Sequence, residues 1–432
     1  MTRKLNVYLY GKRAGVLSED DLGHLQFQYY PGAEHQISVR MPVHADIYER
    51  LYAEPFFDNL TPEGDPLKII AAHYGVSANN PFSILDKIGG DCAGAVSLYE
   101  GDMPQSAVSA PIAIDEGTIA KIIDNLPTNP LLTGIDNAPR LSLAGAQSKF
   151  AVRKDDTGKY YRSDDMRPTT HIIKIKNTQY PSLLENELFC MMLVDRVLGN
   201  KEVPVRLSQA DGRPYLEIKR YDRRPVLVKE KWINTEQDLS GLLLVQGFKM
   251  ERIHQEDFCQ VLGYPANKKY QTDGGPNIRD LYNAVAEYSV FKAKDAVRFI
   301  NLMMFNYLIG NEDAHAKNFS ILHNGNGTFK LAPAYDLLST EVYSSLKREI
   351  AMLINGKGKY DAITKKDWLA LYGQLGLNPT TTMQEMKRNF ADIVTIAETL
   401  CDELNADDLT KSDIYDEIIA IIKKRFTALF GE

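Results

Sequence analysis

The sequence predicts an α+β protein built from three domains, because its hydrophobic pattern changes twice along the chain. Apolar residues alternate with period two through residues 1–50, as in "LNVYLYGKRAGVLS" and "HLQFQYY", which indicates short antiparallel strands. Strand-like and helical segments mix over residues 140–230, and from about residue 235 the pattern is almost wholly helical. The expected domains are a β-rich N-terminal accessory α/β domain at 1–115, a mixed α/β domain at 116–234 and an all-helical domain at 235–432.

The elements follow in order. "DIYERLYAEPFFDNLTPEGDPLKIIAAHYG" predicts helix on both sides of a Pro-Glu-Gly break, and "DCAGAVSLYEGD" predicts a strand. A Pro/Asn-rich connector, "NLPTNPLLTGIDNAPR", leads to a hairpin turning at Asp155–Gly158, a strand at "THIIKIK" and an amphipathic helix at "SLLENELFCMMLVDRVLG". "RPYLEIKRYDRR" predicts a strand that runs into a linker. Within the helical domain, strand-like interruptions are expected at "FSILHNGNGTFKLAPAYD" and near 345–355.

The composition excludes several classes of protein. With 432 residues, 44% hydrophobic and 25% charged, the chain can bury a large core. A net charge of −7 argues against a protein that mainly coats nucleic acid, and the basic patch "KRYDRR" is expected as a solvated face at a domain junction. No apolar run approaches the roughly 20 residues of a membrane span and no secretory signal is evident, so we expect a cytoplasmic protein without membrane contact.

The cysteines and histidines give no sign of a metal or disulfide framework. The four cysteines are far apart and form no CxxC pair, which fits reduced thiols in a core. The eight histidines are scattered and form no HExxH motif, so a zinc site is not expected.

A glycine-containing loop, "RLSLAGAQSKFAV", is the first candidate binding element. Glycine and alanine let backbone N–H groups approach an anionic ligand closely, and a loop between strands can lay them over phosphates. The loop is neither G-x-G-x-x-G nor a Walker A motif, and an ordinary β-turn explains it equally simply.

Lys174 and Glu187 form the second candidate. Lys174 lies mid-strand in "HIIKIK", and Glu187 falls on the apolar stripe of the following helix. A carboxylate on a buried stripe is costly unless a cation meets it, so Lys174 is the expected partner. The alternative is that Glu187 lies at the edge of the stripe in water.

The third candidate is "NEDAHAKNFS" together with Asp336. The spacing from Asp313 to Asn318 is that of the protein-kinase catalytic loop, in which the aspartate acts as base and the asparagine binds metal. A strand hairpin then leads to Asp336, where a kinase has its second magnesium ligand. The sequence departs from that pattern, since it has no H-R-D and has "YDLLS" in place of D-F-G. The order of the three candidates favours a two-lobed, kinase-like architecture over a solvated loop.

At these residues the chain resembles the HipA-type serine/threonine kinases, the toxins of toxin–antitoxin pairs. The resemblance covers nearly the whole chain, including "FFDNLTPEGD" in the accessory domain. The motifs that carry it are "SLAGAQSK", "THIIKIK", "ENELFC", "KRYDRR", "QEDFCQVLG", "YQTDGGP", "GNEDAHAKNFS" and "LAPAYDLLS".

The resemblance implies a role for each matching residue. Lys174 would hold ATP phosphates and Glu187 would orient it. Asp313 would be the catalytic base, with His315 and Lys317 contacting phosphate or the catalytic aspartate. Further nucleotide contacts would come from Ala144, Gly145, Ala146, Gln147, Asn318 and the hinge residues Lys219, Tyr221 and Asp222. Mg²⁺ would be coordinated by Asn318 and Asp336.

The resemblance also implies regulation and partners. Ser142 matches the serine that family members autophosphorylate, which ejects the loop and switches the enzyme off. The partners implied are a HipB-like helix-turn-helix antitoxin, operator DNA held through that antitoxin, and a protein substrate such as a glutamate-tRNA ligase or another translation factor. A dimer within the antitoxin complex is also implied. The chain is longer than its relatives over about 225–255.

Two other functions remain open at this stage. A catalytically idle kinase fold could act as a co-repressor or scaffold, which ATP binding without transfer would mark. Kinase-like lobes also phosphorylate small molecules, and a sugar or lipid pocket cannot be recognised in one sequence.

Overall fold

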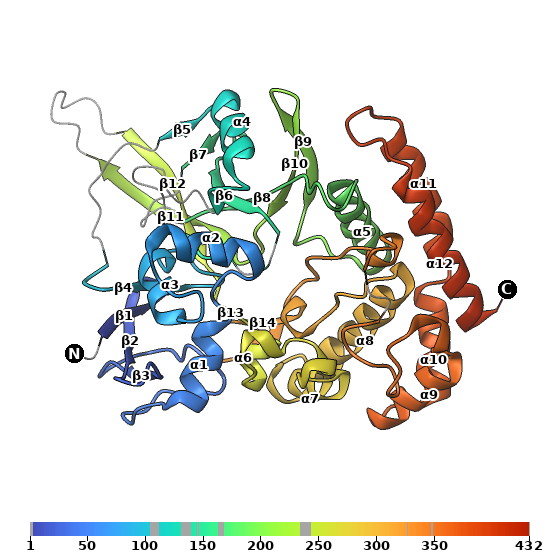
Figure 1. Cartoon of the computed structure of the whole chain (residues 1–432), viewed down its shortest axis with the longest axis horizontal. Coiled ribbons are helices and arrows are strands. Elements are labelled where there is room, and N and C mark those ends of the chain that lie inside the picture. Colours follow the sequence, from blue (N-terminus) through green and yellow to red (C-terminus); the bar gives the residue numbers. More distant parts are fainter. Residues whose placement is uncertain are drawn as a thin grey trace.

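The computed structural model describes most of the chain and shows it folded into three parts (Figure 1). The accessory domain (blue) and the helical lobe (yellow to red) lie side by side, and a sheet domain (cyan to green) lies across one end of both. The described residues are 3–103, 112–130, 140–143, 145, 147–162, 168–233, 243–325, 327–346 and 349–431.

The accessory domain is a four-stranded antiparallel sheet covered by three helices. Its strand order is β3-β2-β1-β4, from β1 (Arg3–Leu9), β2 (Lys12–Glu19), β3 (Leu25–Tyr29) and β4 (Val96–Tyr99). The helices are α1 (Arg50–Asp58), α2 (Gly64–Tyr74) and α3 (Pro81–Ile88). The predicted strands and the helix break at Pro-Glu-Gly are therefore confirmed. The Asn80 side chain accepts a hydrogen bond from the Ser83 N–H, which caps α3 directly before Pro81.

The second domain is a six-stranded sheet in the order β5-β7-β6-β8-β10-β9. Its strands are β5 (Ala113–Ile114), β6 (Lys149–Lys154), β7 (Tyr160–Tyr161), β8 (His171–Ile175), β9 (Val205–Ala210) and β10 (Arg213–Lys219). Its helices are α4 (Glu116–Asn125) and α5 (Leu183–Leu198). Asp155 Oδ1 accepts hydrogen bonds from the Thr157 and Lys159 amides, which closes the predicted hairpin turn between β6 and β7.

The structure differs from the sequence prediction after residue 220. The predicted linker is instead a strand, β11 (Arg223–Ile233), which pairs antiparallel with β12 (Leu243–Arg252). β12 lies in the region expected to be helical. Much of the long 225–255 segment therefore belongs to a two-stranded ribbon formed by β11 and β12. The ribbon spans the boundary expected at 234.

The rest of the chain is mainly helical. Its helices are α6 (Phe258–Leu262), α7 (Ile278–Tyr288), α8 (Lys292–Ile309), α9 (Lys365–Gln374), α10 (Pro379–Asn389), α11 (Ile393–Asn405) and α12 (Ile414–Phe430). A small sheet of order β13-β14-β15 comprises β13 (Gln255–Asp257), β14 (Ser320–His323) and β15 (Phe329–Leu331). The strand expected near 345–355 is absent from the described part of that segment, which has only an isolated bridge between Ile354 and Lys357.

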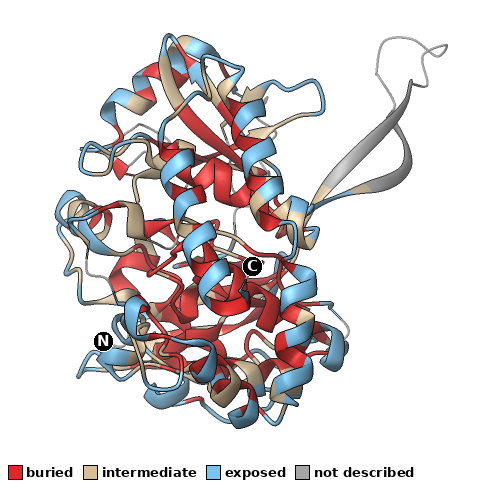
Figure 2. Ribbon diagram, turned by 90° about the vertical axis from the view of Figure 1, so that its right-hand side faces the viewer, coloured by how far each residue is buried: buried red, intermediate tan, exposed pale blue. Residues whose placement is uncertain are grey.

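One hydrophobic core joins the sheet domain to the helical lobe. α5 contributes Leu188, Phe189 and Val194 to the cluster that also contains Phe305 of α8 and Tyr415 of α12. The Phe189 and Tyr415 rings stack with centroids 5.0 Å apart. Figure 2 shows this buried interior running through the length of the molecule. Among the described residues no helix combines the length and the apolar character that crossing a membrane requires.

Candidate active site

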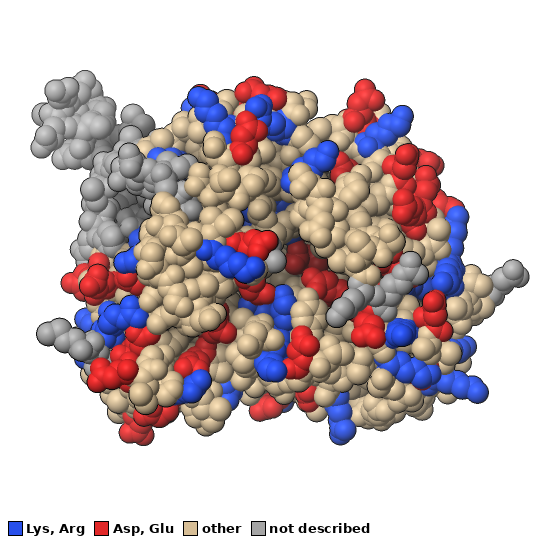
Figure 3. Space-filling model, viewed as in Figure 1, with Lys and Arg blue, Asp and Glu red and all other residues tan. Residues whose placement is uncertain are grey.

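Apart from Ser142, the predicted site residues that the structure describes line one cleft, which has a volume of about 930 Å³. Its walls come from all three parts of the chain, including Leu60 and Glu63 of the accessory domain, Lys174 of β8 and Asp313 after α8. Figure 3 shows the molecule hollowed near the centre of this face, with acidic and basic side chains inside the hollow.

Lys174 lies at the centre of the cleft between two carboxylates. Its Nζ is 2.7 Å from Glu187 Oε1 and 2.5 Å from Asp336 Oδ1. The contact expected between Lys174 and Glu187 is therefore present, and both side chains are buried. Burial alone would lower the pKa of Lys174, but the two carboxylates raise it above its ordinary value, so the ammonium is fully charged. Partial burial alone would raise the pKa of Asp336, but Lys174 and Lys149 hold it well below its usual range.

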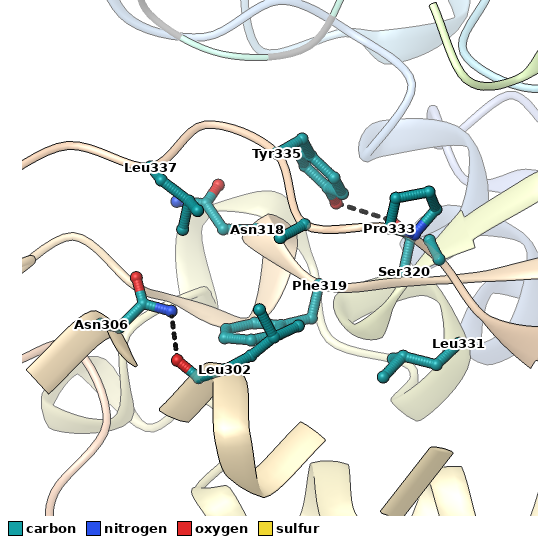
Figure 4. A pocket seen from close by; sticks show the side chains of 11 residues that line it. Leu302, Asn306, Asn318, Phe319, Ser320, Leu331, Pro333, Tyr335 and Leu337 are labelled. Atoms are coloured by element: carbon teal, nitrogen blue, oxygen red, sulfur yellow. Dashed lines mark hydrogen bonds between the residues drawn. The ribbon is translucent and has the colours of Figure 1, made fainter. Parts of the chain in front are cut away.

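Tyr335 fixes the position of Asp336 relative to the segment that contains Lys317 and Ser320. Its hydroxyl bonds to the Ser320 hydroxyl at 2.6 Å and donates to the Lys317 carbonyl at 2.7 Å. Figure 4 shows Tyr335 above Ser320, with Asn318 beside them. Asp336 itself has a φ of 57°, a left-handed conformation that costs energy for a residue with a side chain. The two hydrogen bonds hold the strained turn and aim its carboxylate at Lys174.

Asp313 lies in the loop that follows α8. Gly310, with a φ of 77°, ends the helix, and the Asp313 amide then donates to Asn311 Oδ1 at 3.0 Å. The Asn318 side chain donates to the Asp313 carbonyl at 2.8 Å, which closes the loop. The Asp313 carboxylate is 46% exposed and accepts a hydrogen bond of 2.5 Å from the Tyr270 hydroxyl. It is therefore the most open carboxylate of the predicted set.

His315 and Lys317 belong to this loop, and both side chains are buried. His315 Nε2 is 3.9 Å from Asp313 Oδ1, and burial lowers the pKa of its ring to about 4, so the ring is neutral at pH 7. Lys317 does not pair with Asp313. Its Nζ is 2.7 Å from Oε1 of Glu63, a residue of the accessory domain, which is a contact that the sequence did not predict.

The glycine-containing loop lies at the mouth of the cleft. Gly145 and Gln147 line it, whereas Ala144 and Ala146 fall outside the described residues. The buried amide nitrogen of Gln147 has no hydrogen-bond partner among the described residues. Ser142 is fully buried, and its hydroxyl donates to the Leu60 carbonyl at 2.5 Å.

The hinge residues Lys219, Tyr221 and Asp222 also line the cleft. The Tyr221 ring stacks on Tyr335, with centroids 5.6 Å apart. The Asp222 carboxylate points toward the accessory domain, where it accepts a hydrogen bond of 2.8 Å from the Gly94 amide.

The expectation of a solvated basic face at "KRYDRR" is wrong for Arg220 and Arg223. Both are buried, and Arg223 lies 2.7 Å from Asp91 and 2.9 Å from Asp222. A buried arginine needs a carboxylate partner, and Asp91 supplies it from the accessory domain. Lys219 and Arg224 are exposed, as predicted.

Four residues of the site were missed by sequence reasoning: Glu63, Lys149, Lys269 and Tyr270. Lys149 lies directly opposite Lys174 in the register of β6 and β8, and burial beside that second cation lowers its pKa to about 8. Strand alternation in "KFAVRK" could have placed Lys149 on the cleft side. No local pattern marks the others, because their partners are distant in sequence. Among the described residues no group of three or more His, Cys, Asp or Glu side chains forms a metal site, and all four cysteines are free and buried.

Comparisons with known proteins identify the family of the chain. The HipA N-terminal domain matches residues 5–99, and the HipA-like C-terminal domain matches residues 141–399. Y4mE of Sinorhizobium fredii, whose name describes it as a kinase, is 36% identical over 387 residues, covering 87% of this chain and 86% of the relative. The serine/threonine-protein kinase toxin HipA of Shewanella oneidensis is 29% identical over 345 residues, covering 77% of this chain and 73% of the relative.

A solved structure gives the fold. HipA of Shewanella oneidensis MR-1, in its complex with HipB and operator DNA, superposes with a TM-score of 0.82 at 23% identity, over 99% of this chain and 97% of that chain. The fold is thus the kinase-like fold of HipA, with two lobes and an accessory domain. The chain belongs to the HipA family.

Proposed function

We propose that this protein is an ATP- and Mg²⁺-dependent serine/threonine-protein kinase that acts as the toxin of a toxin–antitoxin pair. The observation that carries the proposal is the cluster of Lys174, Glu187 and Asp336 in the same cleft as Asp313 and Asn318. Phosphoryl transfer depends mainly on position and charge, and this cleft offers cations for phosphates and the open carboxylate of Asp313 for the acceptor hydroxyl.

Each residue has a chemical role in the proposed transfer. Lys174 and Lys149 hold the phosphates of ATP, and Glu187 keeps the Lys174 ammonium in place. Asp313 accepts the proton of the attacking serine or threonine hydroxyl, while the Tyr270 hydroxyl fixes one of its oxygens by a 2.5 Å hydrogen bond. Because the His315 ring is neutral, it does not offset the negative charge with which Asp313 attracts that proton.

The residues present fit a magnesium ion. Asp336 offers a carboxylate and Asn318 an amide oxygen, which are the ligand types that Mg²⁺ prefers together with phosphate oxygens. The Asn318 amide nitrogen is already used by the Asp313 carbonyl, so its side-chain oxygen is the group left for a cation. When bound, the ion neutralises charge that develops on the phosphates.

Autophosphorylation of Ser142 requires movement of the loop. Ser142 is buried against the accessory domain, so its hydroxyl reaches Asp313 only after the Leu60 hydrogen bond breaks. A phosphate adds about −1.5 to −2 charge and three acceptor oxygens, which the buried position cannot accommodate. The phosphorylated loop therefore stays out, and the ATP site loses one wall.

The proposed partners follow the family. A HipB-like helix-turn-helix antitoxin restrains the toxin and carries operator DNA, as the complex from Shewanella oneidensis suggests. A dimer within that complex is part of the proposal. The substrate is a cytoplasmic protein, with a glutamate-tRNA ligase or another translation factor as the first candidates. The proposal includes three domains with the limits 1–115, 116–234 and 235–432, which can be tested by expressing each part separately.

The proposal is tested by transfer of labelled γ-phosphate from ATP, to the protein itself and to cell-extract proteins. The parent should transfer phosphate only with Mg²⁺, and Asp313→Asn should bind ATP without transferring it. ATP binding without transfer by the unmodified parent would favour a scaffold or co-repressor instead. Transfer to a sugar, lipid or antibiotic but to no protein would favour a small-molecule phosphotransferase.

A further inference from the structure

The segment Asn59–Glu63, which joins α1 to α2 in the accessory domain, lies in the wall of the active-site cleft. Asn59, Leu60 and Glu63 line the cleft directly. The segment belongs to "FFDNLTPEGD", a sequence to which the proposed chemistry gives no role. Its contacts run in two directions.

On one side the segment holds the catalytic loop. Glu63 Oε1 lies 2.7 Å from Lys317 Nζ, and its Oε2 lies 2.6 Å from Lys269 Nζ. Lys317 also donates to the Asn59 carbonyl at 3.4 Å. The side chains are 4% exposed for Lys317 and 16% for both Glu63 and Lys269, so water screens these charges little.

Glu63 is the carboxylate that pairs directly with Lys317, while Asp257 attracts the same ammonium without a direct ion pair. Lys317 adjoins Asn318, the amide that closes the Asp313 loop. A buried ammonium without a carboxylate partner would move toward another anion or toward water. Burial alone would raise the pKa of Glu63, but Lys317 and Lys269 lower it to about 2. The carboxylate is therefore ionised at every pH at which the protein works.

On its other side the segment holds the nucleotide loop. The Leu60 carbonyl accepts the Ser142 hydroxyl at 2.5 Å, and the Glu63 amide donates to the Gly145 carbonyl at 3.4 Å. The Asn59–Glu63 segment thus contacts both the loop that contains Ser142 and Gly145 and the loop that contains Asp313, and phosphate would pass between these two loops.

The segment and the end of α1 before it are also hydrogen-bonded to the helical lobe. Asn59 Nδ2 donates to the Tyr264 carbonyl at 2.9 Å, and Asp58 Oδ2 accepts from the Ala266 amide at 2.9 Å. These bonds fix the segment to the helical lobe, so Glu63 is held on a rigid support.

We propose that Glu63 is a positioning residue of the phosphoryl-transfer site, through which the accessory domain completes the catalytic loop. The inference rests on the proposed kinase function. Glu63 contacts neither nucleotide nor acceptor; it acts by fixing Lys317, which lies within the loop from Asp313 to Asn318.

The test compares Glu63→Gln and Glu63→Asp with a matched control, Glu54→Gln. Glu54 is also a paired carboxylate of the accessory domain, 2.8 Å from Arg50, but it lies outside the cleft. With purified full-length protein and Mg-ATP, Glu63→Gln should lower kcat about tenfold or more while the KM for ATP changes less than about threefold. Glu63→Asp keeps the charge and should recover part of kcat, and Glu54→Gln should match the parent. If Glu63→Gln does not fold, an intermediate kcat for Glu63→Asp carries the test.

A readout independent of catalysis is hydrogen–deuterium exchange without nucleotide. Glu63→Gln should speed exchange in peptides covering 311–320 and leave α9–α12 unchanged. Parental kcat and parental exchange in Glu63→Gln would overturn the inference while the kinase function stands. No transfer by the parent would instead refute the kinase function, and the inference with it.

Discussion

Replacing Lys174 by methionine should destabilise the protein, because it removes the cation that forms ion pairs with both Glu187 and Asp336. Glu187 is fully buried, so its carboxylate would lose its ion-pair partner in a dry environment. Breaking a buried pair from one side costs about 3–5 kcal/mol. Asp336 is 37% exposed, so water would screen its charge and add little to this loss.

A second substitution separates the charge effect from the loss of packing. In Lys174→Met/Glu187→Gln the stranded carboxylate is gone, so this double variant should be about 2–3 kcal/mol more stable than Lys174→Met alone. Methionine has a length close to that of lysine, which keeps the cavity small in both variants.

Urea unfolding followed by circular dichroism measures both effects. With a slope of a few kcal/mol/M, the single variant should unfold at a urea concentration about 1 M or more below the parent. A Lys174→Met midpoint equal to that of the parent would refute the reasoning. So would a double variant no more stable than the single one, since the buried charge would then carry no cost.

Three further predictions follow from the same contacts. Asp313→Asn should lower phosphate transfer by about 100-fold or more and leave the thermal midpoint unchanged, because this carboxylate is half exposed; an equal loss of stability would point to a structural role. The pKa of Glu63 falls from 4.5 to about 2 on folding, so its stabilisation, about 3 kcal/mol, is present above pH 4.5 and lost as pH falls toward 2. The difference in unfolding free energy between parent and Glu63→Gln should shrink over that range, and a constant difference would contradict it. Arg223→Met should lower the thermal midpoint by far more than Arg224→Gln, because Arg223 is buried against Asp91 whereas the Arg224 side chain is 64% exposed. Equal shifts would show that the buried ion pair of Arg223 does not stabilise the protein more than an exposed one.

Local patterns predicted the elements that carry the site. Period-two alternation identified β1 to β3 and β8, and the helical stripe placed Glu187 where it meets Lys174. These predictions succeed because strand and helix periodicity fixes which side of an element a residue faces.

Contacts between domains could not be predicted in this way. Arg223 pairs with Asp91, 132 residues away, and "KRYDRR" therefore resembles a solvated patch until the accessory domain is docked on it. Glu63 pairs with Lys269 across 206 residues for the same reason. The ribbon of β11 and β12 was missed because its many charged residues show little alternation of apolar and polar positions.

The most direct test of the kinase assignment is peptide mass spectrometry of unmodified protein after incubation with Mg-ATP, with Asp313→Asn alongside. The account predicts phosphate on Ser142 in the parent and none in Asp313→Asn. Parent protein that binds ATP yet gains no phosphate, on itself or on any extract protein, would contradict the assignment.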